Sequence, residues 1–90
     1  MLEPPHRVPI EGTLDLHSFQ PRDVASGVEE YITAAHEAGL REVRLIHGRG
    51  RGVQRAIVQA VLERHVLVES FNDAPESHLG ATDCRLKTGD

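Results

Sequence analysis

Residues 41–64 read REVRLIHGRGRGVQRAIVQAVLER, and this stretch decides the fold. Residues 41–48 alternate with a period of two, which predicts a β-strand. One face of this strand carries Val43, Leu45 and His47. Apolar residues then recur at helical spacing from Val53, so a second helix is expected to end near Arg64 or His65. The strand therefore leads into a glycine loop that opens a helix, an arrangement typical of an α/β fold.

Three glycines stand at alternating positions in this loop: Gly48, Gly50 and Gly52. Glycine permits positive φ and carries no side chain, so the backbone N–H groups of such a loop can approach a ligand closely. Arginine favours an anionic ligand, and the loop and the helix after it carry Arg49, Arg51 and Arg55. The alternative is a plain glycine-rich turn whose arginines point into solvent. The spacing is not that of a nucleotide-hydrolase P-loop, which argues against that class.

The rest of the chain predicts three more strands and one more helix. Strands are expected over residues 12–17, 66–73 and 81–87, and the first helix over 21–37. The order β-α-β-α-β-β favours right-handed crossovers and an α/β (α+β sandwich) fold, with a four-stranded sheet and two helices. The last two strands are expected to form a hairpin or an added edge. Residues 1–11 contain three prolines and predict an extended arm before a single domain at 12–87.

The charge distribution limits the kind of ligand. The 90 residues carry a net charge of −4, which argues against a general nucleic-acid binder. Between Arg41 and Arg55, however, five arginines stand against one acidic residue, Glu42. A local anion site fits this distribution, whereas an extended surface that wraps a duplex does not.

The sequence also predicts a cellular setting. The single cysteine, Cys84, excludes a disulfide framework within the chain and a four-cysteine zinc cluster. Residues 1–10 do not resemble a signal peptide, and no apolar run is long enough to span a membrane. We therefore expect a soluble cytoplasmic protein with no membrane partner.

Candidate acid–base residues stand at the ends of the first two strands. Asp15 and His17 are two apart on the predicted first strand, so their side chains are expected on one face, where a carboxylate and an imidazole can work as a pair. His47 ends the second strand, where a lone histidine is more often a packed structural residue. If the two strands are neighbours, all three residues lie at the carboxyl edge of the sheet, where open α/β sheets bind ligands. The alternative is that Asp15 and His17 form the solvated face of an edge strand.

A metal site is the other use for these residue types. Asp15, His17, His47 and His78 are suitable ligands for zinc or manganese, but no two of them stand at a diagnostic spacing. The sequence therefore requires no cofactor, although a divalent metal is compatible with it.

Three short stretches carry a family resemblance: LDLHS at 14–18, IHGRG at 46–50 and HLGAT at 78–82. Together they resemble the small MutS-related (Smr) domain family over residues 12–87. The resemblance implies a compact α/β domain like the C-terminal domain of a translation initiation factor, with endonuclease activity on DNA or RNA. Ser18 replaces the usual glycine of the first motif and is a suitable helix cap. His78 and Leu79 also depart from a third motif that is often richer in glycine.

The predicted function is nucleic-acid binding with structure-dependent endonuclease (nicking) activity. The loop would hold the backbone phosphate, Asp15 and His17 would transfer protons, and His47 would protonate the leaving oxygen. The predicted nucleic-acid-binding set is Gly48, Arg49, Gly50, Arg51, Gly52, Arg55, His78, Gly80 and Thr82. Two other functions stay open: a non-catalytic adaptor that binds nucleic acid, and an enzyme acting on a small phosphorylated molecule. The sequence does not decide between DNA and RNA, nor does it set the oligomeric state.

Overall fold

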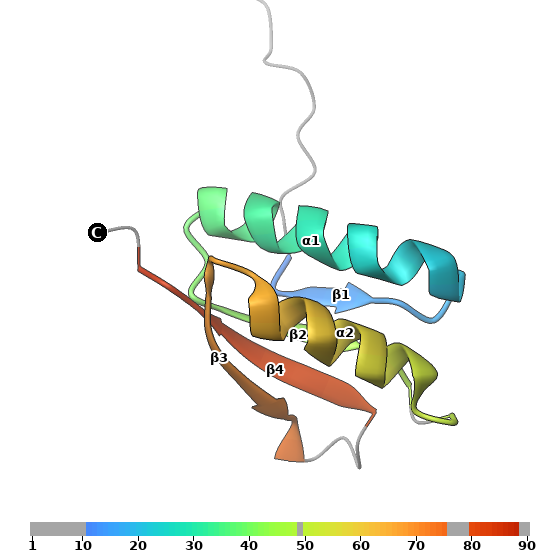
Figure 1. Ribbon diagram of the computed structural model, residues 1–90. Coiled ribbons are helices and arrows are strands. Elements are labelled where there is room, and N and C mark those ends of the chain that lie inside the picture. The colour runs from blue at the N-terminus through green and yellow to red at the C-terminus, as the bar shows by residue number, and fades with distance from the viewer. Residues whose placement is uncertain (1–10, 49, 76–79, 89–90) are drawn as a thin grey trace, which may run out of the picture.

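The protein folds into one sheet and two helices in the predicted order (Figure 1). The structure is a computed structural model, and it describes residues 11–48, 50–75 and 80–88. The elements are β1 (Thr13–Asp15), α1 (Pro21–Glu37), β2 (Glu42–Ile46), α2 (Val53–Arg64), β3 (Val68–Asp73) and β4 (Ala81–Leu86). The predicted α+β architecture is therefore confirmed. The predicted arm lies almost wholly outside the described residues.

The sheet is mixed, with the strand order β1-β2-β4-β3. β1 and β2 are parallel neighbours, while β4 runs antiparallel to both β2 and β3. The predicted hairpin of the last two strands is thus present, and β4 also separates β2 from β3. The last strand is therefore central and β3 forms an edge.

The two faces of the sheet differ sharply. Both helices cover the same face (Figure 1), and their apolar sides pack onto it. The core there is built from Val28 and Ile32 of α1, Val58 and Leu62 of α2, and Val43, Leu45, Cys84 and Leu86 of the strands. On the opposite face, Arg44 of β2 forms an ion pair of 2.7 Å with Asp83 of β4. The helix-covered face therefore holds the core.

The start of the first helix corrects two expectations. β1 ends at Asp15, so His17 lies in a turn and not in a strand over 12–17. The helix begins at Pro21 as predicted, but its N-cap residue is Gln20, without a side-chain hydrogen bond. Ser18 therefore does not cap the helix. Proline at the first helical position needs no N–H partner, so a side-chain cap is less important here.

Candidate functional site

Two loops meet at one end of the sheet. Residues 16–20 connect β1 to α1 and residues 47–52 connect β2 to α2, and both helices begin at this end (Figure 1). The N–H of Leu16 donates to the carbonyl of Ile46 over 2.8 Å, which continues the parallel pairing beyond β1. The side-chain amide of Gln54 donates to the carbonyl of Phe19 over 3.2 Å. The predicted adjacency of the two loops follows from these contacts.

Asp15, the last residue of β1, and His17 of the first loop form a local pair. Asp15 Oδ1 accepts the backbone N–H of His17 at 2.9 Å and lies 2.8 Å from His17 Nδ1. The turn brings the ring back onto the carboxylate, so the pairing does not depend on strand alternation as expected. The backbone N–H of His17, followed by its ring, lowers the pKa of Asp15 below its ordinary value. The side chains are 50 % and 78 % exposed respectively, so a ligand can reach both.

His47 has a very different environment, because it is only 5 % exposed. Its Nδ1 lies 2.9 Å from the carbonyl oxygen of Gly48, and its Nε2 lies 2.9 Å from Thr82 Oγ1. Thr82 is fully buried. Both ring nitrogens are therefore occupied from within the protein. This arrangement does not favour the expected role of His47 as a proton donor or a direct contact of Thr82 with a ligand.

The glycine loop has the backbone conformation that its glycines predict. The φ angles of Gly48, Gly50 and Gly52 are +78°, +35° and +79°, and among the described residues no atom would lie within 4 Å of an added Cβ at any of them. The glycines are thus required by conformation and not by lack of space. The N–H of Gly48 donates to the carbonyl of Gly80 over 2.9 Å, so it is not available to a ligand. Gly80 thereby anchors the base of the loop.

The arginines predicted to bind phosphate differ in their hydrogen-bond partners. Arg51 is exposed and has no side-chain partner within the described residues. Arg55 instead makes two hydrogen bonds to the carboxylate of Asp73, of 2.8 and 2.7 Å. This pairing raises the pKa of Arg55 and lowers the pKa of Asp73. Arg49 and His78 lie outside the described residues.

Two polar residues that the sequence reasoning missed lie behind the loop, Gln59 of α2 and Asp73 of β3. The Gln59 amide donates to Asp73 Oδ1 and to Thr82 Oγ1, each over 3.1 Å. Gln59 stands one helical turn after Arg55, so the two share a helix face. That spacing, next to a face that is otherwise apolar, is the signal that could have found Gln59.

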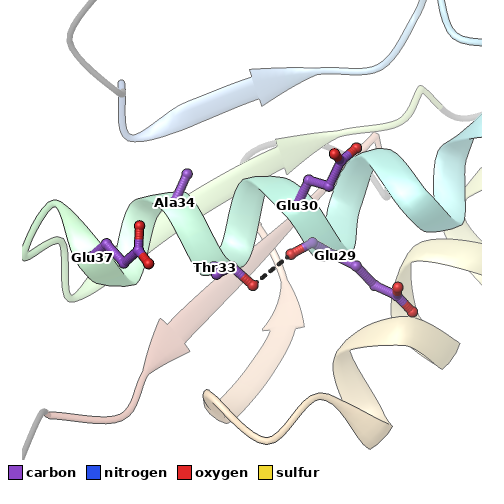
Figure 2. Close-up of a pocket in the computed structure, with 5 residues that line it drawn as sticks. All are labelled: Glu29, Glu30, Thr33, Ala34 and Glu37. Atoms are coloured by element: carbon purple, nitrogen blue, oxygen red, sulfur yellow. Dashed lines mark hydrogen bonds between the residues drawn. The ribbon is translucent and has the colours of Figure 1, made fainter.

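Acidic side chains gather elsewhere, on the outer face of α1 (Figure 2). A shallow hollow there is lined by Glu29, Glu30, Thr33, Ala34 and Glu37. Its residues all come from one helix, and the Thr33 hydroxyl only bonds the carbonyl of Glu29 one turn earlier, at 3.1 Å. The surface is anionic and differs in sign from the arginine-bearing loop.

The described residues form neither a metal-ligand cluster nor a membrane-spanning helix. Within residues 11–48, 50–75 and 80–88, no three His, Cys, Asp or Glu side chains lie together in a way that could hold a metal ion. Neither helix of the described chain is long and apolar enough to cross a bilayer.

Comparison with known proteins identifies the family. The model of the Smr domain matches residues 14–84. The chain belongs to the Smr domain family. The crystal structure of the Smr domain of Thermus thermophilus MutS2 superimposes on this Smr domain with a TM-score of 0.81 and 32 % identity, covering 86 % of this chain and 99 % of that one. YdaL, a stand-alone small MutS-related protein from Escherichia coli, gives a TM-score of 0.79 at 27 % identity, covering 86 % of this chain and 65 % of YdaL.

The sequence relatives are much longer proteins. This Smr domain is 35 % identical over 80 residues to Endonuclease MutS2 of Caldicellulosiruptor saccharolyticus, and the alignment covers 87 % of this chain and 10 % of that protein. A similar protein of the same name from Listeria welshimeri is 35 % identical over 81 residues, with 88 % and 10 % covered. The chain therefore spans about a tenth of the length of these curated relatives.

Proposed function

We propose that this Smr domain binds the backbone of DNA or RNA at the edge formed by its two loops and cleaves it there. One observation carries the proposal: an exposed carboxylate–imidazole pair, Asp15 and His17, stands beside a glycine loop that opens a helix. The MutS2 relatives are named endonucleases, and this name supports cleavage of a nucleic-acid backbone as the reaction.

The binding half of the proposal rests on the glycine loop and the start of α2. The first turn of α2 carries no acidic residue, so the partial positive charge of the helix N-terminus is not offset there. Gly50 is exposed in this loop, and its backbone N–H is proposed to meet phosphate oxygens. Arg51 supplies a full positive charge, and Arg49 is proposed to add a second. Phosphate contacts of this kind hold the backbone and carry no base information.

The cleavage half rests on the Asp15–His17 pair. When the ring is neutral and its Nδ1–H faces the carboxylate of Asp15, the lone pair lies on Nε2. Nε2 then removes a proton from a water molecule or a ribose hydroxyl, whose oxygen attacks the phosphorus as the leaving oxygen departs. The loop N–H groups and arginines stabilise the charge that develops on the phosphoryl oxygens. Because His47 is buried, solvent is the proposed proton source for the leaving oxygen.

A non-catalytic adaptor is the second candidate. It is favoured by the burial of His47, since only one of the two predicted histidines is open to a substrate. Such a module would use the glycine loop in the same way and would leave the backbone intact.

A cleavage and binding assay on matched DNA and RNA probes tests the proposal. Labelled single strands, duplexes, hairpins and branched junctions are incubated with the protein, with and without a chelator, and binding is titrated at several salt concentrations. Each phosphate contact contributes about 0.7 to 0.9 to the slope of log K against log salt, so Arg51→Ala should lower the slope by about that amount. Arg64→Ala is the matched control, because Arg64 pairs with Glu29 far from the loop.

The outcomes separate the two candidate functions. Cleavage of at least one probe supports the endonuclease, while binding without cleavage of any probe supports the adaptor. If neither binding nor cleavage occurs, or if Arg51→Ala and Arg64→Ala behave alike, the loop is not a phosphate cradle.

A further inference from the structure

A chain of side-chain hydrogen bonds runs beneath the glycine loop. We call it the relay, and its members are Arg55, Asp73, Gln59, Thr82 and His47. Arg55 bonds Asp73 at 2.7 and 2.8 Å, Gln59 bonds both Asp73 and Thr82 at 3.1 Å, and Thr82 bonds His47 at 2.9 Å. The other ring nitrogen of His47 then reaches the carbonyl of Gly48 at 2.9 Å. The relay thus connects α2, β3 and β4 to Gly48, the first glycine of the loop.

When the ring of His47 is neutral, the chemistry of the groups fixes the direction of every bond in the relay. The carboxylate of Asp73 can only accept, so the amide NH₂ of Gln59 must face it, and the second N–H of that group points to Thr82. The hydroxyl of Thr82 accepts this bond and is left with one proton, which it donates to Nε2 of His47. The carbonyl of Gly48 can only accept, so Nδ1 of His47 carries the ring proton. The relay therefore specifies one tautomer of the neutral ring.

The burial of Thr82 and His47 strengthens the hydrogen bonds that select this tautomer. Thr82 is fully buried and His47 is 5 % exposed, so water does not readily replace the bonds they make. Hydrogen bonds in such an environment are stronger and breaking one leaves an unpaired polar group. Within the described residues, every buried side-chain nitrogen and oxygen has a partner.

We propose that Gln59, Thr82 and Asp73 are positioning residues for the glycine loop, acting through His47. The His47 N–H holds the Gly48 carbonyl against the buried ring and so sets the plane of the peptide that opens the loop. Because a peptide unit is planar, holding this carbonyl restricts the direction in which the chain enters the loop. The inference rests on the proposed function for its binding readout, and the relay itself can be tested without it.

The central test compares two substitutions of Thr82. Thr82→Val keeps the shape of the side chain and removes the hydroxyl, whereas Thr82→Ser keeps the hydroxyl. We expect Thr82→Val to weaken the binding of a fluorescein-labelled single-stranded oligonucleotide about tenfold, the scale of one lost hydrogen bond in a network, and Thr82→Ser to restore it to within about twofold. Gln59→Met, which keeps the length of the side chain without its donors, should also weaken binding.

A stability-matched control separates positioning from general damage. Val61 is buried on α2 and belongs to the core and not to the relay. Val61→Ala should lower the melting temperature at least as much as Thr82→Val but leave binding unchanged. The relay proposal is overturned if Val61→Ala weakens binding as much as Thr82→Val does, or if Thr82→Val and Gln59→Met both bind like the wild type.

A spectroscopic readout keeps the test independent of nucleic acid. ¹⁵N NMR of the imidazole should show the Nδ1–H tautomer of His47 in the wild type and in Thr82→Ser, and a mixture of tautomers in Thr82→Val. The amide resonances of Gly48, Gly50 and Gly52 should shift in Thr82→Val and Gln59→Met only. If the wild type binds no probe, the proposed function fails, but these resonances still test the relay proposal. Unchanged amide resonances of the loop in both variants would refute that proposal.

Discussion

His17 and His47 follow neighbouring parallel strands at the same end of the sheet, yet the protein uses them differently. The side chain of His17 is 78 % exposed and pairs with the carboxylate of Asp15, two residues earlier at the end of β1. His47 is 5 % exposed and is bonded through Thr82 to residues of two other elements. The proposed function therefore assigns the substrate-facing role to His17, and the relay proposal assigns the support of the loop to His47.

The difference shows that position at a sheet edge does not define a side chain's role. His47 follows Val43 and Leu45 in strand alternation, so its ring lies on the helix-covered face. His17 comes after a turn has left the sheet, and its ring is free of that face. The direction of each side chain relative to the core therefore accounts for the difference in exposure between the two histidines.

The largest expected effect is on cleavage, through Asp15→Asn. The amide is nearly isosteric but cannot hold His17 with a charged acceptor, so we expect cleavage to fall at least about a hundredfold, the usual scale of one acid–base group, while nucleic-acid binding persists. Single-turnover cleavage and binding titrations on one probe measure both. Glu30→Gln on the outer face of α1 is the control. Undiminished cleavage by purified Asp15→Asn and His17→Ala proteins would place the chemistry elsewhere.

The second effect is on stability and contrasts the two histidines directly. His47→Ala opens a cavity and leaves the buried hydroxyl of Thr82 without its acceptor, so it should cost about 2 to 4 kcal/mol of unfolding free energy. His17→Ala removes an exposed side chain and should cost about 0.5 kcal/mol or less. Urea unfolding of both variants measures the two free energies. Equal losses of unfolding free energy in the two variants would contradict the proposed structural role of His47.

A smaller effect is expected from the loop backbone. Valine is strained at positive φ, and Gly50→Val places it in the proposed phosphate cradle, so binding should weaken about tenfold in a protein that still folds. Gly39→Val is the matched control, because Gly39 has a φ of +86° and open space around it but follows α1 at the other end of the fold. Anisotropy titrations and thermal melts compare the pair. Wild-type affinity in a folded Gly50→Val protein would argue against a backbone cradle.

The smallest effect concerns acid pH. Arg55 holds the pKa of Asp73 below its ordinary value of 3.8. A carboxyl group with a lowered folded pKa stabilises the protein above that ordinary value, and this contribution is lost as the pH falls through the folded pKa. The difference in melting temperature between the wild type and Asp73→Asn should therefore be constant above about pH 5 and shrink below pH 3.8. A difference that stays constant into strong acid would mean that the Asp73 charge does not support the relay.

Much of the fold follows from local patterns. The alternation in residues 41–48, the apolar spacing of the two helices and Pro21 predicted elements that the structure contains. The alternating glycines predicted positive φ, which all three have. These features depend on residues that are close in sequence, so they can be predicted without knowledge of the fold.

The arrangement of the site was harder to predict. Thr82, which bonds the His47 ring, lies on β4, and Gln59, which bonds Thr82, lies on α2. Both are more than ten residues from His47 in sequence, so no local period indicates them. One signal was present: Val43, Leu45 and His47 share a strand face, and that face is buried. The alternation therefore indicated a buried imidazole, but the motif at the strand end favoured a catalytic interpretation. The pairing of Arg55 with Asp73 likewise depends on β3 lying beside α2.

The central place of β4 has a consequence for the order in which the protein is made. β4 is the last of the described elements to leave the ribosome, yet it fills the space between β2 and β3 and supplies both Gly80, just before it, and Thr82. A nascent chain that has emerged only as far as β3 lacks the strand that joins the two halves of its sheet. During translation the glycine loop is thus without support until the final strand inserts, and the assembly of the site coincides with the completion of the fold.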